Sequence, residues 1–556
     1  MKPTDEQASA VKMAKTGKTM KLNAFAGAGK TATLKLIANE LAPKKGVYLA
    51  FNKTIANEAK KKMPSNIEAR TFHSIALAGV PKWMRDKLNV PQIHINDFIK
   101  RFAIDTVYIE SFDKIYTQDD EGKVTSSMVG CTKPVSPYKL KRIIDDALKK
   151  FVSSDDRVPR KKYIKEALEE EFADEIQLQP QVFRQLEERM SYIMDVLWED
   201  YTSEHGTLGL AGNHDIYLKH WSNSNPVINA DFILFDEAQD ADGLMLRVLN
   251  RQVAQVIFVG DKHQQIYGWR GAVNALESID ANEGFLTQSF RFGRQLAERC
   301  QPLLEHLGEK KSIKGTGDDT TVSNLSGRGV VDAVLCRSNS GVIAKMLELV
   351  DDEIECKLNI DVNSAIKMLE DMNDLRENTK DIDLSSQSVD IYKTKNNKLQ
   401  FRSWSELEMY IADYGGDMET SLYYRIITSY PLSMIVAILY KSAKNEEGVF
   451  ITTAHKAKGM EWDRVALCSD FLNIYFEMDG SDVVMTPASV KFKEKRLRAY
   501  NIHPDLMIPT LREVDSEEFR LLYVAMTRAR KMLYMGDTQL IIDDYLKYYD
   551  LYFKED

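Results

Sequence analysis

The feature that most constrains the fold is a glycine-rich turn between a predicted strand and a predicted helix. The strand covers 19–24, helical periodicity covers 31–41, and the turn between them reads Ala26-Gly27-Ala28-Gly29-Lys30-Thr31. Backbone N–H groups of such a turn surround phosphate oxygens, and the helix N-terminus adds positive potential. We therefore expect Lys30 to reach the β- and γ-phosphates of a nucleotide and Thr31 to hold Mg²⁺. An ordinary glycine-rich turn is the alternative, because Ala24 stands where the pattern usually has its first glycine.

A second apolar strand, predicted over 232–235, ends in two carboxylates, Asp236 and Glu237. In a parallel α/β sheet, ligands bind at the carboxyl ends of the strands. Asp236 is expected to hold Mg²⁺, and Glu237 is expected to orient and deprotonate a water molecule. A solvated acidic turn is the alternative. Together with Lys30 and Thr31, the pair favours hydrolysis of a nucleoside triphosphate.

The chain is long enough for several domains and repeats one plan twice. Its 556 residues suggest roughly three or four units. Short apolar strands alternate with helices near the N-terminus and again from about 330, whereas long charged helices are predicted over 145–152, 161–172 and 181–198 and a mainly helical stretch over 361–443. We expect two parallel α/β sheet domains, each interrupted by a largely helical insertion.

Composition narrows the classes of protein. Lys and Arg number 74 against 83 Asp and Glu, a formal charge of −9, so any nucleic acid must be bound by a local basic track. The five cysteines are scattered and form no C-x-x-C pair, which argues against a zinc ribbon and for a reducing compartment. The N-terminus lacks an apolar signal sequence, and the apolar run 431–440 is too short for a membrane span. A soluble, intracellular protein is expected (cytoplasmic or nucleoid-associated, or nuclear in a eukaryote), with no membrane partner.

Further motifs resemble those of the UvrD/Rep-type superfamily 1 DNA helicases, in the order of that family. The segment 260–272 (GDKHQQIYGWRGA) resembles motif III, 50–53 (AFNK) motif Ia, 288–291 (QSFR) motif IV, 452–462 (TTAHKAKGMEW) motif V and 518–529 (EFRLLYVAMTRA) motif VI. The segments 4–7 (TDEQ) and 71–74 (TFHS) are similar to two further motifs of the family. The lead-in 25–27 and the variant 286–292 (LTQSFRF) look closest to the motor core of the F-box DNA helicases.

The resemblance implies a role for each matching residue in the nucleotide site. Gln7 would recognise adenine, and Phe290 would stack on the base. Glu461 of motif V, close to Gly459, would accept a hydrogen bond from the ribose. Gln264 would sense the γ-phosphate, which Arg291 and Arg528 would reach in the transition state. The nucleotide-binding set is thus Gln7, Ala26, Gly27, Ala28, Gly29, Lys30, Thr31, Phe290, Gly459 and Glu461. The catalytic set is Lys30, Glu237, Gln264, Arg291 and Arg528.

The resemblance also implies a path for single-stranded DNA. Tyr267 and Trp269 would stack on bases, which tolerates any sequence, and the alternative for each is a buried core aromatic. The residues expected along the strand are Phe51, Asn52, Thr71, His73, Tyr267, Trp269, Thr453 and His455. For His73 and for His455, each taken alone, the alternative is a structural histidine that makes no DNA contact.

The fold implied by the resemblance is α/β, with two RecA-like P-loop domains that each carry a mainly helical insertion. Domain 1A would comprise 1–85 and 201–293 around insertion 1B (86–200). Domain 2A would comprise 294–345 and 446–556 around insertion 2B (346–445). ATP would bind between 1A and 2A, with Mg²⁺ as the metal.

The implied function is an ATP-dependent DNA helicase that moves 3′ to 5′ on single-stranded DNA and unwinds duplexes at single-strand/duplex junctions. One alternative is an ATP-driven remodeller that strips proteins such as recombinase filaments from single-stranded DNA with little unwinding. Another is a small-molecule P-loop kinase, which would leave Tyr267, Trp269 and Arg528 unexplained. The sequence leaves the protein partners open and is compatible with a monomer.

Overall fold

The chain forms two compact units, which are described separately. One comprises Met1–Asp113 and Met128–Thr287, and the other comprises Lys114–Ser127 and Gln288–Asp556. The structure, a computed structural model, describes residues 2–50, 53–91, 93, 95–118, 124–206, 208–268, 274–325, 327, 331–380, 382, 392–396, 398–399, 401–414, 418–471, 476–477, 510–511, 515–536, 538, 542 and 546.

The first unit is built on a parallel six-stranded sheet of order β3-β2-β6-β7-β1-β8. Its strands are β1 (Met20–Ala24), β2 (Gly46–Ala50), β3 (Ile67–Thr71), β6 (Phe232–Asp236), β7 (Gln255–Gly260) and β8 (Asn282–Leu286). The order reverses next to β1, so the chain crosses from one side of the sheet to the other. Functional groups after β1, β6 and β7 therefore meet at one edge, the carboxyl edge.

Helices cover both faces of this sheet because its strands are apolar on both sides. On one face, Phe232 and Leu234 of β6 pack with residues of α1 (Asp5–Ala14), α2 (Lys30–Glu40) and α3 (Lys53–Lys62). On the other face, Ile233 and Phe235 pack with α4 (Phe72–Gly79), α10 (His214–Asn223), α11 (Gly243–Leu249) and α12 (Ala275–Ser278). The period of two along β6 is what divides the core into these two layers.

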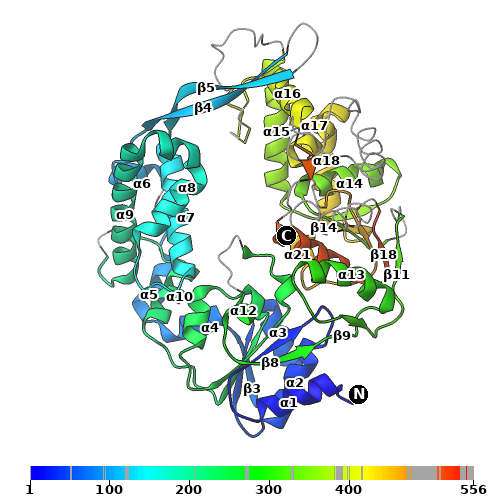
Figure 1. The fold of residues 1–556 in the computed structure, drawn as a ribbon. Coiled ribbons are helices and arrows are strands. Elements are labelled where there is room, and N and C mark those ends of the chain that lie inside the picture. The colour runs from blue at the N-terminus through cyan, green and yellow to red at the C-terminus, as the bar shows by residue number, and fades with distance from the viewer. Residues whose placement is uncertain are drawn as a thin grey trace, which may run out of the picture. The chain divides into compact units, whose positions relative to one another are not determined.

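Between β3 and β6 the chain forms a helical insertion with a core of its own. Its helices are α5 (Lys82–Asp86), α6 (Ile95–Arg101), α7 (Pro137–Ser153), α8 (Lys161–Leu178) and α9 (Pro180–Thr202). Leu140, Phe151, Ile164 and Met194 are among its buried residues. Figure 1 shows α7, α8 and α9 packed side by side.

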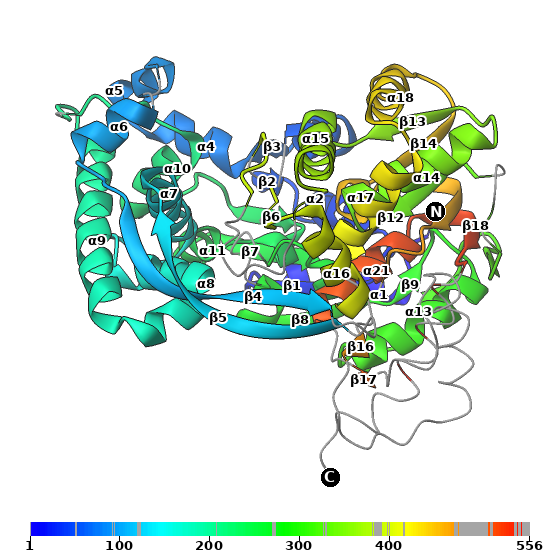
Figure 2. The same cartoon turned by 90° about the horizontal axis from the view of Figure 1, so that it is seen from above.

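The insertion also contains a long two-stranded ribbon that the helical pattern did not predict. It pairs β4 (Val107–Gln118) with β5 (Val124–Val135), and Figure 2 shows the two strands twisting along their length. Ile109, Ser111 and Val135 are buried, whereas Tyr108 and Phe112 are exposed. This alternation, with its β-branched and aromatic residues, favours strands over helix.

The second unit repeats the plan with another parallel six-stranded sheet, of order β11-β18-β15-β12-β14-β13. Its strands are β11 (Thr321–Ser323), β12 (Ala333–Cys336), β13 (Cys356–Asn359), β14 (Val449–Thr453), β15 (Trp462–Leu467) and β18 (Ala529–Tyr534). Two short pairs join β9 (Gln288–Ser289) to β10 (Lys314–Gly315) and β16 (Phe476–Glu477) to β17 (Thr510–Leu511). The helices are α13 (Arg294–His306), α14 (Asn339–Asp351), α15 (Val362–Thr379), α16 (Trp404–Tyr414), α17 (Met418–Ser429), α18 (Leu432–Lys444), α19 (Ala454–Ala457) and α21 (Ser516–Met526).

Two parallel α/β sheets confirm the predicted fold class, and the helices α15 to α18 lie between β13 and β14 as the second insertion. Strand β13 belongs to the second sheet although it falls inside the range 346–445 expected for that insertion. Among the described helices, none alone is long and apolar enough to cross a membrane. The pair Glu419–Ser429 and Leu432–Lys444, bent by 111°, meets that length and composition only when taken together.

Candidate functional site

The glycine-rich turn leaves β1 and enters α2 through backbone that only glycine adopts freely. Gly27 has φ +73°, and Gly29, the residue before α2, has φ +75° and ψ +34°. An L side chain is strained in this left-handed region. Lys30 is therefore the first residue of α2, at the carboxyl edge of the sheet, and Gly29 provides no side-chain cap, which suits anion binding at this helix N-terminus.

Lys30 lies among three carboxylates. Its Nζ is 3.1 Å from Oε2 of Glu237, and both side chains are mostly buried. Burial alone would lower the pKa of Lys30, but the charges of Glu237, Asp236 and Asp261 outweigh it and hold the pKa above its ordinary value. Lys30 is thus a fixed cation just after the turn that follows β1. A bound phosphate would replace Glu237 as the partner of its ammonium group.

Asp236 ends β6 and has the chemistry of a magnesium ligand. Its Oδ1 accepts from the N–H of Glu237 at 2.9 Å, and its Oδ2 accepts from the hydroxyl of the buried Tyr48. Burial and the charge of Glu237 raise its pKa to about 6. Asp236 and the exposed hydroxyl of Thr31 supply the hard oxygen donors that Mg²⁺ prefers, so these residues fit that ion.

Glu237 has a strained backbone and is held by Gln239. Its φ is +54°, which is rare outside glycine and marks functional sites. The fully buried Gln239 donates from Nε2 to Oε2 of Glu237 at 2.7 Å, and its Oε1 accepts from the N–H of Asp261 at 3.0 Å. Asp261 in turn accepts from Nε2 of Gln264 at 2.7 Å. One hydrogen-bonded series therefore joins the ends of β6 and β7.

Gln7 contacts the helix that begins at the glycine-rich turn. It forms a capping box with Thr4 at the start of α1, and its Nε2 donates to Oγ1 of Thr33 at 3.2 Å. The Thr33 hydroxyl itself donates to the carbonyl of Gly29 at 3.1 Å. Two hydrogen bonds therefore link Gln7 to the turn. Recognition of adenine by Gln7 remains a prediction.

In the second unit, three of the predicted nucleotide residues line one hollow of about 520 Å³. Phe290 is 42% exposed, and Nε of Arg291 lies 2.7 Å from Oε2 of Glu461. The loop 316–318 forms another wall, where a Cβ on Gly317 would come within 2.8 Å of the carbonyl oxygen of Phe290. Arg530 and Lys531 of β18 also line the hollow and pair with Asp463.

Arg528 is buried and held by backbone oxygens of its own unit. It is 2% exposed, and its guanidinium donates to the carbonyls of Val524 at 2.8 Å and Met460 at 3.3 Å. Gly459, which precedes Met460, has φ +86° and open space around its Cα. The structure therefore places Arg528 close to the predicted motif V residues, in contact with their main chain.

The predicted DNA-contacting residues that the structure describes lie at or just after strand ends. Thr71 ends β3 and caps α4, accepting from the N–H of Ser74 at 3.2 Å. His73 packs against the rings of His214 and Tyr217 and lies 3.6 Å from the carboxylate of Asp215. Tyr267 lies in the segment that follows β7, Thr453 is the buried last residue of β14, and His455 lies on α19 directly after that strand. The predicted contacts Phe51, Asn52 and Trp269 lie outside the described residues.

Comparison with known proteins decides the family. Residues 3–279 match the family model of the UvrD/REP helicase N-terminal domain. The chain belongs to the UvrD/Rep-type helicases. Over 94% of its length, this UvrD-type helicase chain is 27% identical to F-box DNA helicase 1 of Gallus gallus, across 48% of that protein. It is 26% identical to F-box DNA helicase protein 1 of Schizosaccharomyces pombe, again over 94% of the chain and 56% of the relative.

A DNA helicase II homolog of Mycoplasma genitalium matches a smaller part of this UvrD-type chain, at 31% identity over 18% of the chain and 17% of the relative. Among solved structures, a helicase of PRRSV aligns at a TM-score of 0.23 and 11% identity, over 57% of this chain and 37% of the other. This similarity is too low to indicate a common fold. The chain spans about half the length of the F-box helicases it matches. The resemblance seen in the sequence is thus confirmed for the UvrD-type family and its F-box branch.

From the sequence, no role was predicted for several residues that hold this candidate site together. Tyr48, Gln239 and Asp261 were not predicted, although Gln239 and Asp261 stand inside the motifs around Asp236 and Gln264. Arg530 and Lys531 were also missed. Their place just after Arg528 can be read from the sequence, but only the pairing of β18 with β15 brings them to Asp463.

Proposed function

We propose that this chain is an ATP-dependent DNA helicase that moves 3′ to 5′ on single-stranded DNA and couples ATP hydrolysis to duplex unwinding. The observation that carries the proposal is the contact of Lys30 with Glu237 beside Asp236, directly after a glycine turn at the carboxyl edge of a parallel sheet. A cation and two carboxylates in that position suit a nucleoside triphosphate and its metal. Membership of the UvrD-type family favours DNA as the track.

The residues of the first unit have distinct roles in this proposal. Main-chain N–H groups of 26–31 bind the phosphates, and Lys30 neutralises charge on the β- and γ-phosphates. Thr31 and Asp236 would hold Mg²⁺, which would supply further neutralisation of phosphate charge. Glu237 accepts a proton from the attacking water, and Gln239 fixes its carboxylate for that step.

The residues of the second unit act on the base, ribose and γ-phosphate. Phe290 stacks on adenine, with Gln7 of the first unit reading its edge, and Glu461 accepts from the ribose near Gly459. Arg291 and Arg528 stabilise the charge of the transition state. Both arginines have hydrogen-bond partners within their own unit, so this action requires those bonds to be exchanged during the cycle.

Single-stranded DNA is the proposed substrate of the contacts at Thr71, His73, Tyr267, Thr453 and His455. Stacking on aromatic rings and contacts with phosphates are independent of base sequence, as movement along any strand requires. Alternation between nucleotide states then shifts which contacts are tight.

The test is the ATPase rate with and without single-stranded DNA, followed by unwinding of duplexes that carry a 3′ or a 5′ tail. We expect strong stimulation by DNA and unwinding only from the 3′ tail, with a Glu237→Gln protein as the inactive control. A rate indifferent to DNA would point to a small-molecule kinase instead. DNA-stimulated hydrolysis that clears recombinase filaments but opens no duplex would replace the helicase with a remodeller.

A further inference from the structure

Three arginines of the first unit gather around neutral oxygen atoms. Nη2 of Arg157 and Nη1 of Arg251 both donate to Oδ1 of Asn225, the former at 2.6 Å. Arg247 donates from Nη2 to Oδ1 of Asn223 at 2.7 Å and from Nη1 to the carbonyl of Asp155 at 2.9 Å. Within the described part of the chain, no carboxylate forms an ion pair with any of the three.

The electrostatics of these arginines show that positive charge is in excess here. Burial, then the charges of Arg157 and Arg251, lower the pKa of Arg247, and the carboxylate of Asp155 offsets this only in part. Burial, followed by the charge of Arg247, lowers the pKa of the nearby Lys219 to about 7. The Nε of Arg247 is buried and has no hydrogen-bond partner among the described atoms. Such a cluster is stabilised when an anion approaches it.

Three valines stand beside these arginines with most of their surface in water. Val158 follows Arg157 and is 57% exposed, Val227 is 73% exposed, and Val253 is 93% exposed. Hydrogen bonds hold their segments together: Nε2 of Gln252 donates to the carbonyl of Pro226 at 2.9 Å, and Nδ2 of Asn223 donates to the carbonyl of Arg157 at 2.8 Å. We call Arg157, Val158, Val227, Arg247, Arg251 and Val253 the arginine–valine patch.

The patch lies at the edge of the sheet opposite to the nucleotide site. Asn225 and Val227 precede β6, and Arg251 and Val253 precede β7, so both segments lie at the amino ends of these strands. Lys30, Asp236 and Thr71 all lie at or just after carboxyl ends. Opposite ends of a parallel sheet point away from each other, so the arginines and valines of the patch lie away from Lys30, Asp236 and Thr71.

We propose that the arginine–valine patch docks an acidic segment of a partner protein that also carries apolar side chains. The carboxylates would pair with the arginines, which form forked hydrogen bonds with such groups. The valines would cover apolar side chains that a phosphodiester backbone lacks, which is why a peptide fits better than DNA. Arginine is also a residue type enriched where proteins bind each other.

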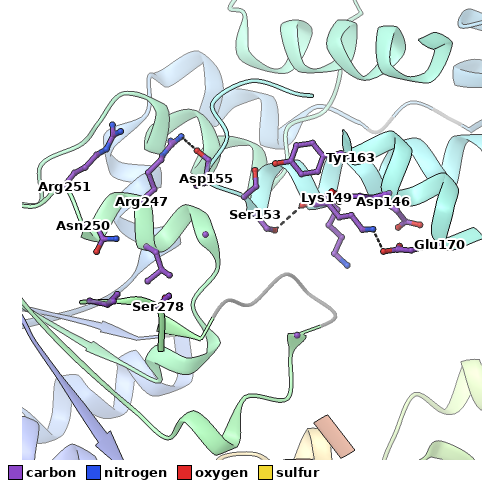
Figure 3. Close-up of a pocket in the computed structure, with 17 residues that line it drawn as sticks. Asp146, Lys149, Ser153, Asp155, Tyr163, Glu170, Arg247, Asn250, Arg251 and Ser278 are labelled. Carbon is purple, nitrogen blue, oxygen red and sulfur yellow. Dashed lines mark hydrogen bonds and ion pairs between the residues drawn. The ribbon is translucent and has the colours of Figure 1, made fainter. Parts of the chain in front are cut away.

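A groove beside the arginines gives the segment room to continue. It has a volume of about 1030 Å³ and is lined by Arg247 and Arg251, by Leu246, Tyr163 and Ile279, and by Gly268 next to Tyr267. Its charged lining also includes Lys149 and Lys150 and the carboxylates of Asp146, Asp155, Glu166 and Glu170, which confine carboxylates of the segment to the part beside Arg247 and Arg251. In Figure 3 the side chains of Arg247 and Arg251 leave neighbouring parts of the chain and point toward the same side, while Tyr163 and Lys149 line the other part of the groove. Apolar side chains of the segment would enter between them.

The experiment measures binding of a fluorescein-labelled peptide of alternating Asp and Leu to the full chain, by anisotropy. A peptide of alternating Asp and Ser has the same charge without apolar side chains, and oligo(dT) measures DNA binding. We expect Arg157→Glu and Arg251→Glu each to weaken binding of the Asp/Leu peptide by about tenfold or more, and Val253→Asp to weaken it as well. The Asp/Ser peptide should bind more weakly than the Asp/Leu peptide to the unchanged chain.

Arg184→Glu is the matched control, because Arg184 is an exposed arginine on α9 of the same unit. It should leave peptide binding unchanged, and all variants should keep DNA-stimulated ATP hydrolysis, which reports folding independently of the patch. The proposal is overturned if the Asp/Leu peptide does not bind, if it binds the patch variants as well as the control, or if Asp/Ser binds equally tightly. A loss of oligo(dT) affinity that matches the loss of peptide affinity would make the patch a DNA contact instead.

Discussion

Lys30 is the single residue on which the candidate ATP site depends most. Its ammonium is surrounded by Glu237, Asp236 and Asp261, and a phosphate would bring further negative charge to the same place. We expect Lys30→Ala to abolish ATP turnover while nucleotide-free DNA binding stays within about a few fold, since the proposed strand-contacting residues lie elsewhere in the chain. Steady-state ATPase and DNA-binding assays check this. Lys15→Ala, directly after α1, is the control, because the Lys15 side chain forms an exposed ion pair with Glu40 far from the candidate site. Loss of DNA binding by folded Lys30→Ala protein would contradict it.

Gln239 is a positioning residue rather than a catalytic one. Its amide joins Glu237 to the main chain of Asp261 and is fully buried. We expect Gln239→Leu to lower kcat by about 10- to 100-fold, because a hydrogen bond to a charged group is worth about 1.5–3 kcal/mol, with little change in KM for ATP. Gln239→Glu would place a second carboxylate against Glu237 and should lower kcat further. An unchanged kcat in stable Gln239→Leu protein would show that Glu237 needs no support.

At the scale of the element, the cap of α11 links stability to pH. Oδ1 of Asp242 accepts from the N–H of Met245 at 2.7 Å, and burial raises the pKa of Asp242 to about 6. The folded chain therefore binds the proton of the Asp242 carboxyl more tightly than the unfolded chain, in which the pKa of this group is near 3.8. The stability that Asp242 contributes is fully present at a pH below its pKa in the unfolded chain and is lost as the pH rises through its folded pKa of about 6.

Asp242→Asn should remove this dependence without removing the cap, because asparagine also caps helices well. We expect the variant to be more stable than the unchanged chain by about 1–2 kcal/mol at neutral pH, with the gain shrinking toward about pH 4. Chemical unfolding followed across that pH range measures it. A gain that is constant with pH, or a loss at every pH, would rule out titration of Asp242 as the cause.

At the scale of the whole molecule, Arg528 tests whether both units take part in hydrolysis. Arg528 belongs to the second unit, whereas Lys30 and Glu237 belong to the first. If Arg528 acts on the transition state, Arg528→Ala should lower turnover far more than it weakens ATP binding, and arginines in this role elsewhere are worth about 10³–10⁵ in rate. DNA stimulation should be lost with it.

Because Arg528 is buried and holds two carbonyls, Arg528→Ala also removes packing, so Arg528→Lys is measured beside it. Lysine keeps the charge but not the fork of donors, and we expect it to recover stability more than turnover. ATP affinity, turnover and thermal midpoint of both variants separate the two effects. DNA-stimulated hydrolysis near the unchanged rate in folded Arg528→Ala protein would end the two-unit mechanism.

The sequence alone determined the two α/β sheets, the glycine turn and the family, because these depend on local patterns. The run from Met20 to Thr31 encodes a strand, a turn that needs glycine and a helix within a few residues of one another, and the order of the motifs carries the resemblance. Strand β14 follows from an apolar run in the same way. By contrast, the ribbon β4–β5 lies inside the insertion that was expected to be mainly helical, and strand β13 lies inside the range 346–445 expected for the second insertion. The alternation of buried and exposed residues in β4 favours a strand, but its pairing with β5, and that of β13 with β14, is a tertiary contact.

Only the tertiary structure decided which residues support the site and where the charges balance. Gln239 meets Glu237 and Asp261 because β6 and β7 are neighbours, and Tyr48 meets Asp236 because β2 pairs with β6. Arg157 comes from the insertion, whereas Arg247 and Arg251 lie on α11 and directly after it, and Asn223 and Asn225 accept hydrogen bonds from these arginines. Side-chain hydrogen bonds and charge interactions act over a few ångströms in space, whatever the separation along the chain. No pattern in the sequence reports that proximity, which is why these residues were found only after the strands had been placed.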